Sequence, residues 1–411
     1  MSSVNKKKKV FVALSGGVDS SVSLYLLKKA GFDVMAVFIK IGECAPEAGN
    51  HLRAEDCWIG ERREAMRAAA YLNVPFLTFD FDKEYKKEVL DYFFREYKAG
   101  RTPNPDVMCN RKIKFPLFWK KAKALGADFM ATGHYARIAS GDAGNPKSEA
   151  RNPKLLSLHS RHSAVSSWLN DESGNPDFKL LAGVDKEKDQ SYFLYNLKRK
   201  DLEHILFPIG NFKKTEVRKI AKEAGLPTAE KKDSQGLCFL GQVNVRDFLK
   251  TKIKTKKGKI VDSSGKVLGE HDGLYYYTIG QRHGIGVSGG SERYFVVEKN
   301  IKKNELVVAP ERDEKKFHKK WLAVGDLNLI SNKIKFPINC SARIRYRAPL
   351  EKCIITPPTP SYLKRGGKTN IPRAKSRGFI VKFFKPQRAI APGQSIVFYK
   401  GEEVLGGGTI K

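Results

Sequence analysis

The stretch Ala-Leu-Ser-Gly-Gly-Val-Asp-Ser at residues 13–20 decides the fold, and it directly follows the apolar run 10–12. This order predicts a strand, then a glycine turn, then a helix. Glycine lets backbone N–H groups come close to a phosphate, and the N-terminus of the following helix favours the anion. Ser15, Asp19 and Ser20 add hydroxyl and carboxylate oxygens that suit further phosphate contacts and a magnesium ion.

The turn is not a Walker loop, because no lysine follows its second glycine. It resembles the pyrophosphate loop, SGGxDS, of the ATP pyrophosphatases, which adenylate an oxygen of their substrate and release pyrophosphate. Taken alone, the loop leaves several substrates open: an acid that becomes an amide, a purine, an arginine precursor or a tRNA base.

Composition narrows this choice. The 411 residues predict two or three domains, and 76 Lys and Arg against 44 acidic residues give a net charge of +32. An enzyme that acts on a small molecule does not need so large a positive charge, whereas an enzyme with a polyanionic substrate uses it to attract that substrate. No apolar run approaches the length of a membrane span, and the first residues lack a signal-peptide pattern.

Six cysteines are scattered without a CxxC pair. This spacing argues against a zinc ribbon, an iron–sulfur cluster and a secreted disulfide framework. We therefore expect a soluble protein of the reducing cytoplasm, with no tightly bound metal and no membrane partner.

The first third of the chain alternates between predicted strands and predicted helices, which indicates a doubly wound parallel α/β sheet. We expect strands at 10–14, 34–39, 76–80 and 129–132, and helices at 20–29, 61–72, 85–97 and 113–125. Ligands of such sheets bind at the carboxyl ends of the strands. Ser15, Gly133 and His134 all follow predicted strands there.

The rest of the chain changes character twice. We expect a surface insertion at 140–178, helical structure at 189–227, and short strands at 259–261, 275–279, 294–298 and 306–308. Beyond Trp321, strands at 340–346, 378–384 and 395–399, with a loop at 356–376, indicate a small β-module. The predicted domains are 1–241, 242–312 and 313–411.

Two further motifs carry cysteines. In the segment 100–111, Cys109 precedes a predicted helix, and a helix N-terminus with nearby cations lowers a thiol pKa. Asp106 stands three residues earlier, where it can exchange a proton. In the segment 231–241, Cys238 follows a basic, glycine-containing turn. Two such cysteines suggest sulfur chemistry, in which one thiolate carries a persulfide and the other releases the sulfur and closes a disulfide.

Together these motifs resemble those of the tRNA-specific 2-thiouridylases of the MnmA type over nearly the full length. The matching segments are 15–21, 100–115, 131–135, 188–194, 231–241, 277–282, 389–399 and 405–408. The resemblance implies a pyrophosphatase-type catalytic domain, a small central domain and a C-terminal β-barrel. It also implies adenylation of the wobble uridine 2-oxygen by ATP with Mg²⁺, followed by sulfur transfer.

The resemblance also implies residue roles. Asp106 would be the acid or base, Cys238 would carry a persulfide from a cysteine desulfurase or a sulfur-relay protein, and Cys109 would be its partner nucleophile. Residues implied to bind ATP are Ala13, Leu14, Ser15, Gly16, Gly17, Val18, Asp19, Ser20, Ile39 and Gly133. Residues implied to contact tRNA are Asn104, Pro105, Asp106, His134, Lys188, Asp189, Gln190, Arg345, Tyr346 and Gln394.

The chain departs from the family pattern in places. His283 stands where a lysine is frequent, and Pro116 stands where a glycine is usual, so that a helix is expected to begin at Pro116. Residues 40–60, with Cys44 and Cys57, match poorly. The competing hypotheses are a small-molecule ATP pyrophosphatase, another tRNA sulfurtransferase, and a nucleic-acid-binding protein with an inactive catalytic domain. The attacking species is also open: either hydrosulfide or the persulfide itself.

Overall fold

The structure, a computed structural model, describes residues 7–42, 58–140, 177–233, 244–287, 292–331, 334–357 and 378–411. Cys44, Cys57 and Cys238, and nearly all of the predicted insertion and loop, lie outside these ranges. The chain forms two compact units. Unit 1 comprises residues 1–89, 106–242 and 401–405, and unit 2 comprises 90–105, 243–400 and 406–411.

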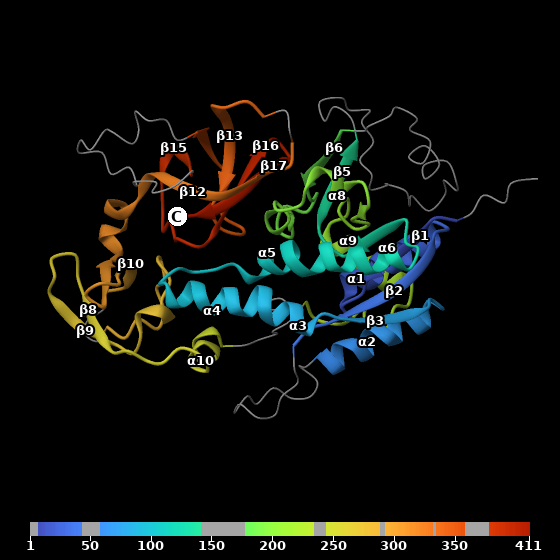
Figure 1. The fold of residues 1–411 in the computed structure, drawn as a ribbon, viewed down its shortest axis with the longest axis horizontal. Helices are drawn as coiled ribbons and strands as arrows, with labels where there is room; N and C mark the ends of the chain where they lie inside the picture. Colours follow the sequence, from blue (N-terminus) through green and yellow to red (C-terminus); the bar gives the residue numbers. More distant parts are fainter. Residues whose placement is uncertain are drawn as a thin grey trace, which may run out of the picture. The chain divides into compact units, whose positions relative to one another are not determined.

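Unit 1 is built on a five-stranded parallel sheet with the strand order β3-β2-β1-β4-β7 (Figure 1). Its strands are β1 (Lys9–Ala13), β2 (Asp33–Lys40), β3 (Phe76–Asp80), β4 (Phe129–Thr132) and β7 (Ile205–Leu206). The chain runs from β1 outward to β3 on one side and continues through β4 on the other. The gap between the carboxyl ends of β1 and β4 is therefore the topological switch point, where doubly wound sheets bind ligands.

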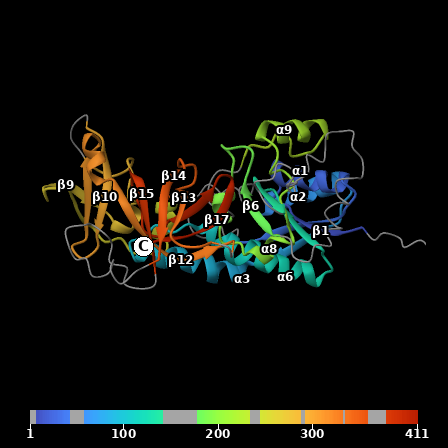
Figure 2. The same cartoon turned by 90° about the horizontal axis from the view of Figure 1, so that it is seen from above.

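Side chains of β1 alternate between two apolar layers, which is why helices cover both faces of the sheet. Val10 and Val12 pack into one core with residues of α1 (Val18–Lys29), α2 (Trp58–Tyr71) and α9 (Lys214–Glu223). Phe11 points to the other face and contacts the Phe79 ring, which in turn contacts Phe118 of α6 (Pro116–Ala124). Figure 2 shows α1, α2 and α9 on one side of β1 and α6 on the other. The predicted doubly wound sheet is confirmed.

Two predicted helical regions of unit 1 are more broken than expected. The region 85–97 divides into α3 (Asp82–Tyr85), a π-helical turn η3 (Lys86–Leu90) and α4 (Asp91–Lys98), of which α4 belongs to unit 2. The region 189–227 contains η5 (Ser191–Phe193), α8 (Arg199–Leu202), β7 and α9. The expected helical structure is therefore confirmed in these helices but wrong at Ile205 and Leu206, which pair with β4 instead.

The remaining elements of unit 1 follow the sheet. They are α5 (Pro105–Cys109), the π-helical turn η4 (Asn110–Lys114), and a hairpin of β5 (Ala136–Ser140) and β6 (Phe178–Ala182). The sequence analysis did not predict this hairpin. As expected, α6 begins at Pro116, a position where the missing proline N–H is not needed.

Unit 2 contains a four-stranded sheet with the order β10-β11-β8-β9. Its elements are α10 (Val245–Lys250), β8 (Gly258–Val261), β9 (Val267–His271), η6 (Leu274–Tyr276), β10 (Tyr294–Asn300), β11 (Glu305–Pro310) and η7 (Glu311–Phe317). The strand expected at 275–279 is wrong. A 3-10 turn forms there because the buried Tyr276 hydroxyl donates to the Ile253 carbonyl oxygen at 2.9 Å.

Six strands close into a barrel in the order β12-β15-β14-β13-β16-β17, with β12 pairing with β17. They are β12 (Lys319–Leu329), β13 (Ile338–Arg343), β14 (Glu351–Thr356), β15 (Phe379–Gln387), β16 (Ser395–Lys400) and β17 (Glu403–Ile410). All belong to unit 2 except residues 403–405 of β17, which are grouped with unit 1. Pairing of Val324 with Ile410 closes the ring. The predicted C-terminal β-module is confirmed as a barrel. Contacts group it with the four-stranded sheet, and the expected domain boundaries at 241 and 312 stay predictions.

Candidate active site

The turn between β1 and α1 is stabilised by its own hydroxyl groups. The Ser20 hydroxyl accepts from the Ser15 backbone N–H at 3.2 Å, lies 3.1 Å from the Ser15 hydroxyl, and donates to the Gly17 carbonyl at 3.1 Å. Helix α1 then begins at Val18, with Asp19 in its first turn. The turn thus presents backbone N–H groups and a helix N-terminus at the carboxyl end of β1, as the sequence predicts for a phosphate site.

Two glycines of the site have a steric reason. Gly16 has a φ of +75°, and a Cβ there would lie 2.4 Å from the Glu61 carbonyl oxygen. Gly133 follows β4, and a Cβ there would lie 2.8 Å from the Ser20 backbone nitrogen. The ends of β1 and β4 therefore approach each other at backbone distance, which confirms that Ser15, Gly133 and His134 share one edge of the sheet.

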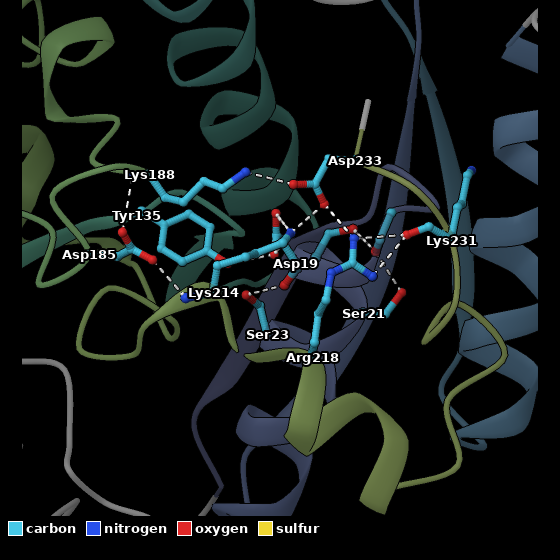
Figure 3. Close-up of polar contacts among 12 residues, drawn as sticks. Asp19, Ser21, Ser23, Tyr135, Asp185, Lys188, Lys214, Arg218, Lys231 and Asp233 are labelled. Atoms are coloured by element: carbon cyan, nitrogen blue, oxygen red, sulfur yellow. Dashed lines mark hydrogen bonds and ion pairs between the residues drawn. The ribbon is translucent and has the colours of Figure 1, made fainter. Parts of the chain in front are cut away.

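The Asp19 carboxylate is held from two sides, as Figure 3 shows. The Tyr135 hydroxyl donates to Oδ1 at 2.8 Å, and the Lys214 ammonium donates to Oδ1 and Oδ2 at 2.7 and 2.9 Å. Burial and the negative charge of Asp19 raise the pKa of Tyr135, so its hydroxyl keeps its proton and remains a donor. Asp19 is thus an oriented carboxylate beside the turn.

A second carboxylate, Asp233, gathers three cations. Its Oδ1 lies 2.8 Å from Lys214 Nζ and 2.7 Å from an Arg218 nitrogen, and its Oδ2 lies 2.8 Å from Lys188 Nζ. Burial alone would raise the pKa of Asp233, but the ammonium groups of Lys188 and Lys214 outweigh it and hold that pKa well below its usual range. Asp233 therefore stays ionised.

Lys214, Arg218 and Asp233 were not singled out from the sequence. Lys214 lies 195 positions from Asp19, and no local pattern indicates that they meet. The available signal was weak: Lys214 opens an amphipathic helix, whose first residues lie near its positive end. Lys231 of the third motif donates to the Gly16 carbonyl at 3.1 Å, which brings that motif to the turn.

His134 is half-buried and neutral. Its Nδ1 lies 2.6 Å from the Thr132 hydroxyl, and its ring contacts the rings of Phe115 and Phe207. Burial, together with the positive charge of Lys114, holds the pKa of His134 well below its usual range. A neutral imidazole can contact a base or ribose but adds no positive charge for a phosphate.

The segment Lys188, Asp189 and Gln190 has mixed roles. Asp189 is 3% exposed, and its carboxylate accepts from the backbone N–H groups of Gly183 and Ser191, both at 3.0 Å. The Gln190 side chain accepts from the Tyr135 backbone N–H at 3.0 Å. These two residues fix the turn, and Lys188 is the one of the three whose charged end lies at Asp233. Their contacts with tRNA stay predictions.

Cys109 differs from its expected setting. It is the last residue of α5 and is followed directly by η4, so it lies inside a helical stretch that begins at Pro105. The expected helix N-terminus at Cys109 is therefore wrong, and Asp106 occupies the first turn instead. The Cys109 side chain is 1% exposed. Cys238 lies outside the described residues, so the predicted meeting of the two cysteines stays a prediction.

The remaining expected ATP-binding residues are apolar and shape the sheet edge. Ala13 ends β1, Leu14 donates its N–H to the Val37 carbonyl at 2.8 Å, and Ile39 lies near the carboxyl end of β2. Leu14, Val18 and Ile39 are buried. Their side chains are part of the hydrophobic core, so a contact with ATP at these residues would come from their backbone atoms or from the small exposed part of a side chain.

Of the five expected tRNA contacts in unit 2, Arg345, Tyr346 and Gln394 already have partners within the fold. An Arg345 nitrogen donates to the carbonyls of Ile279 at 2.6 Å and Ala389 at 3.0 Å. The Gln394 side chain donates to the carbonyl of Thr102 at 3.0 Å and that of Pro103 at 3.1 Å, so it fixes the segment that leads to Asn104. Tyr346 lies beside the Arg347 guanidinium.

In the part of the chain that the structure describes, no group of three or more His, Cys, Asp or Glu side chains is placed to hold a metal ion. No helix in the same ranges has the length and hydropathy to cross a membrane.

Three family models match the chain in order. They are described as a tRNA methyl transferase HUP domain over residues 8–242, a tRNA methyl transferase PRC-barrel domain over 246–310, and an aminomethyltransferase beta-barrel domain over 365–410.

Curated relatives match over the whole length. The tRNA-specific 2-thiouridylase MnmA of Lysinibacillus sphaericus is 41% identical over 404 residues, covering 98% of this chain and 94% of the relative. That of Listeria monocytogenes serotype 4a is 41% identical over 411 residues, covering 100% and 96%. Among solved structures, a 4-thiouridine synthetase–RNA complex with bound ATP is 17% identical, covers 59% of this chain and 50% of that chain, and has a TM-score of 0.33, too low to support an argument.

Proposed function

Because this chain belongs to the family of tRNA-specific 2-thiouridylases, we propose that it is an ATP-dependent sulfurtransferase that converts the wobble uridine of tRNA to 2-thiouridine. The observation that supports this most strongly is the identity of about 40% across 98–100% of the chain with proteins of that name. The net charge of +32 suits a polyanionic substrate such as tRNA.

In the first half-reaction, the uridine 2-oxygen attacks the α-phosphate of ATP. An oxygen–phosphorus bond forms, pyrophosphate leaves, and the poor leaving group becomes an adenylate. The turn at residues 13–20, with Ile39 and Gly133, is assigned to ATP. The positive end of α1 and the nearby ammonium groups of Lys214 and Lys231 suit the negative charge that builds on the phosphates.

A magnesium ion fits this site through Asp19. A magnesium site typically combines one or two carboxylates with substrate phosphates and water, so a single oriented carboxylate beside a phosphate-binding turn is sufficient on the protein side. The ion would neutralise phosphate charge when bound. The Asp19 carboxylate accepts hydrogen bonds from Tyr135 and Lys214, and both donors orient it.

In the second half-reaction, sulfur replaces AMP. Cys238 is assigned the persulfide, supplied by a cysteine desulfurase or a sulfur-relay protein. Cys109 is assigned the second thiol: its attack on the Cys238 sulfur forms a disulfide and expels hydrosulfide, which displaces AMP. Alternatively the persulfide itself attacks the adenylate, and Cys109 then forms the disulfide as it releases the thiolated base. Either route leaves Cys109 and Cys238 oxidised to a disulfide, and an external thiol must reduce this disulfide by two electrons before the next turnover.

RNA recognition is assigned to residues of both units. They are Asn104, Pro105, Asp106, His134, Lys188, Asp189, Gln190, Arg345, Tyr346 and Gln394, with Asp106 as the acid or base near the uridine. The target base must leave its stack to reach a partly buried site. These reactants fit a protein of the cytoplasm.

The test is direct. Purified full-length protein is incubated with ATP, Mg²⁺, a cysteine desulfurase with cysteine, and unmodified tRNA, and the digested tRNA is analysed by mass spectrometry. The proposal expects 2-thiouridine, AMP and pyrophosphate in equal amounts. Formation of AMP with a carboxylic acid or purine substrate but no thiolated tRNA would instead support a small-molecule synthetase.

Cysteine variants test the sulfur route. Cys238→Ser is expected to abolish thiolation but leave pyrophosphate release, because adenylation precedes sulfur transfer. Cys109→Ser is expected to stop multiple turnover. Cys340→Ser is the matched control, since Cys340 is a half-buried thiol of the barrel. Undiminished thiolation by Cys238→Ser with the desulfurase as donor contradicts the persulfide assignment.

A further inference from the structure

Three cations converge on one carboxylate beside the ATP-binding turn. Asp233 lies 2.8 Å from Lys214, 2.7 Å from Arg218 and 2.8 Å from Lys188 (Figure 3). The Lys214 side chain is 11% exposed, and those of Asp233, Arg218 and Lys188 are 31–33% exposed. Ion pairs shielded to this degree are screened less by salt and are stronger than pairs on the open surface.

Lys214 joins this carboxylate to the ATP side. Its ammonium contacts both oxygens of Asp19 and one oxygen of Asp233. A lysine ammonium has three protons, and these three contacts use all of them. Without the charge of Asp233, the Lys214 ammonium would keep only the Asp19 carboxylate of these two anionic partners, and it could move relative to that carboxylate.

Lys188 joins the same carboxylate to the RNA side. The backbone N–H of Lys188 donates to Asp185 Oδ1 at 3.2 Å, and the backbone N–H of Lys214 donates to Asp185 Oδ2 at 2.8 Å. Asp185 therefore fixes the backbones of the two lysines together, while Asp233 fixes their charged ends. The two lysines form one rigid group rather than two separate surface charges.

The charges of this group balance. Asp19, Asp185 and Asp233 oppose Lys188, Lys214 and Arg218, three of each sign. A triphosphate at the turn, or an RNA phosphate at Lys188, draws on cations that Asp233 already holds. Binding of either phosphate must therefore change how strongly Asp233 attracts the lysine at the other site.

We propose that Asp233 is a positioning residue: it orients Lys214 on Asp19 at the ATP-binding turn and holds Lys188 through the same carboxylate, and so couples the affinities for ATP and tRNA. The inference rests on the proposed function, which supplies the roles of Asp19 and Lys188. It adds a residue that contacts neither substrate and acts through two lysines.

Asp233→Asn in the full-length protein is the test, because asparagine keeps the shape and an acceptor oxygen but loses the charge. The affinity of a non-hydrolysable ATP analogue is measured with and without saturating unmodified tRNA. In the wild type, tRNA is expected to change this affinity about fivefold or more, and in Asp233→Asn less than about twofold. The kcat of pyrophosphate release is expected to fall about tenfold with little change in the KM for ATP, because orientation is lost rather than attraction.

Three variants separate this role from a structural one. Glu230→Gln breaks an exposed pair with Lys222, 3.1 Å apart, and is expected to keep the wild-type coupling. Asp233→Glu restores the charge and is expected to recover part of both effects. If Asp233→Asn lowers the melting temperature too far, Lys188→Gln, which breaks one arm of the group, is expected to remove the coupling by itself.

Wild-type coupling and kcat in a folded Asp233→Asn variant, or the lack of any coupling in the wild type, overturns the inference. This outcome is distinct from failure of the proposed function. That failure is read from the absence of 2-thiouridine in the wild-type reaction, while ATP and tRNA binding are measured without turnover.

Discussion

At the residue scale, Gly133 allows the end of β4 to approach the backbone of the proposed ATP-binding turn. We expect Gly133→Ala to weaken ATP binding strongly, because its Cβ would lie 2.8 Å from the Ser20 nitrogen and 3.0 Å from the Asp19 carbonyl carbon. The contacts are with backbone, so the turn must move away from β4. Overpacking of this kind costs about 1–3 kcal/mol. Calorimetric titration with an ATP analogue measures the loss, and thermal unfolding measures the cost.

Gly126→Ala is the control for this variant. Gly126 also adopts a positive φ, +84°, but a Cβ there meets no atom within 4 Å. It should lower stability by about 1–2 kcal/mol through backbone strain and leave ATP affinity unchanged. Equal ATP affinity in Gly133→Ala and wild type would contradict the close approach of the two strand ends.

Single residues also mark the limit of sequence reasoning. The turn at residues 13–20 is readable because its chemistry is local: glycines, hydroxyls and an acid follow one strand. The roles of Lys214 and Asp233 cannot be predicted in that way, since only the folded chain brings Lys214 into contact with both Asp19 and Asp233. The same reasoning applies to Tyr135, whose place in a motif was visible but whose hydrogen bond to Asp19 was not.

At the element scale, the first four strands of the parallel sheet were predicted better than the helix boundaries. The strands Phe76–Asp80 and Phe129–Thr132 coincide with the predicted ranges, because short apolar runs bounded by polar residues leave little choice of ends. Cys109 shows the opposite case: a proline at the first helical position extended the helix upstream of the thiol. The strand β7 has two residues and carries no periodic signal, so it could not be distinguished from the helices around it.

Strand β10 carries a prediction about pH. Lys299 donates to the Tyr277 carbonyl at 2.9 Å, and burial lowers the pKa of Lys299 to about 8. The unfolded chain, with a lysine pKa of about 10.4, binds more protons between pH 8 and 10.4, so stability rises with pH in this window. We expect the wild type to gain stability relative to Lys299→Met from pH 8 to 10 and to show a constant difference at pH 6–7.

Urea unfolding at each pH and fixed salt measures this difference. Lys302→Met removes an exposed lysine of the adjoining turn and should follow the wild-type curve. Parallel curves for wild type and Lys299→Met across pH 8–10 would mean that the ammonium of Lys299 is as well solvated in the fold as in the unfolded chain.

At the scale of the whole molecule, the net positive charge can be counted directly from the sequence, but the fold does not identify the residues that use it to bind a partner. A net charge of +32 implies a polyanionic partner without saying which residues touch it. Part of the charge is internally used: Lys188, Lys214 and Arg218 pair with Asp233. The tRNA affinity therefore depends on how many cations contact RNA phosphates, and the salt dependence of binding reports that number.

We expect the affinity for unmodified tRNA to fall by about 10³ or more between 50 and 200 mM salt, which corresponds to six or more phosphate contacts. The affinity for an ATP analogue should fall far less, because one triphosphate engages few cations and the turn contributes uncharged N–H groups. Filter binding at four salt concentrations gives the two slopes. A tRNA without a wobble uridine should bind more weakly with a similar slope, since phosphate contacts do not depend on the base. If the affinity for the cognate tRNA does not change with salt concentration, the basic residues do not contribute to tRNA binding. The positive charge would then serve another partner.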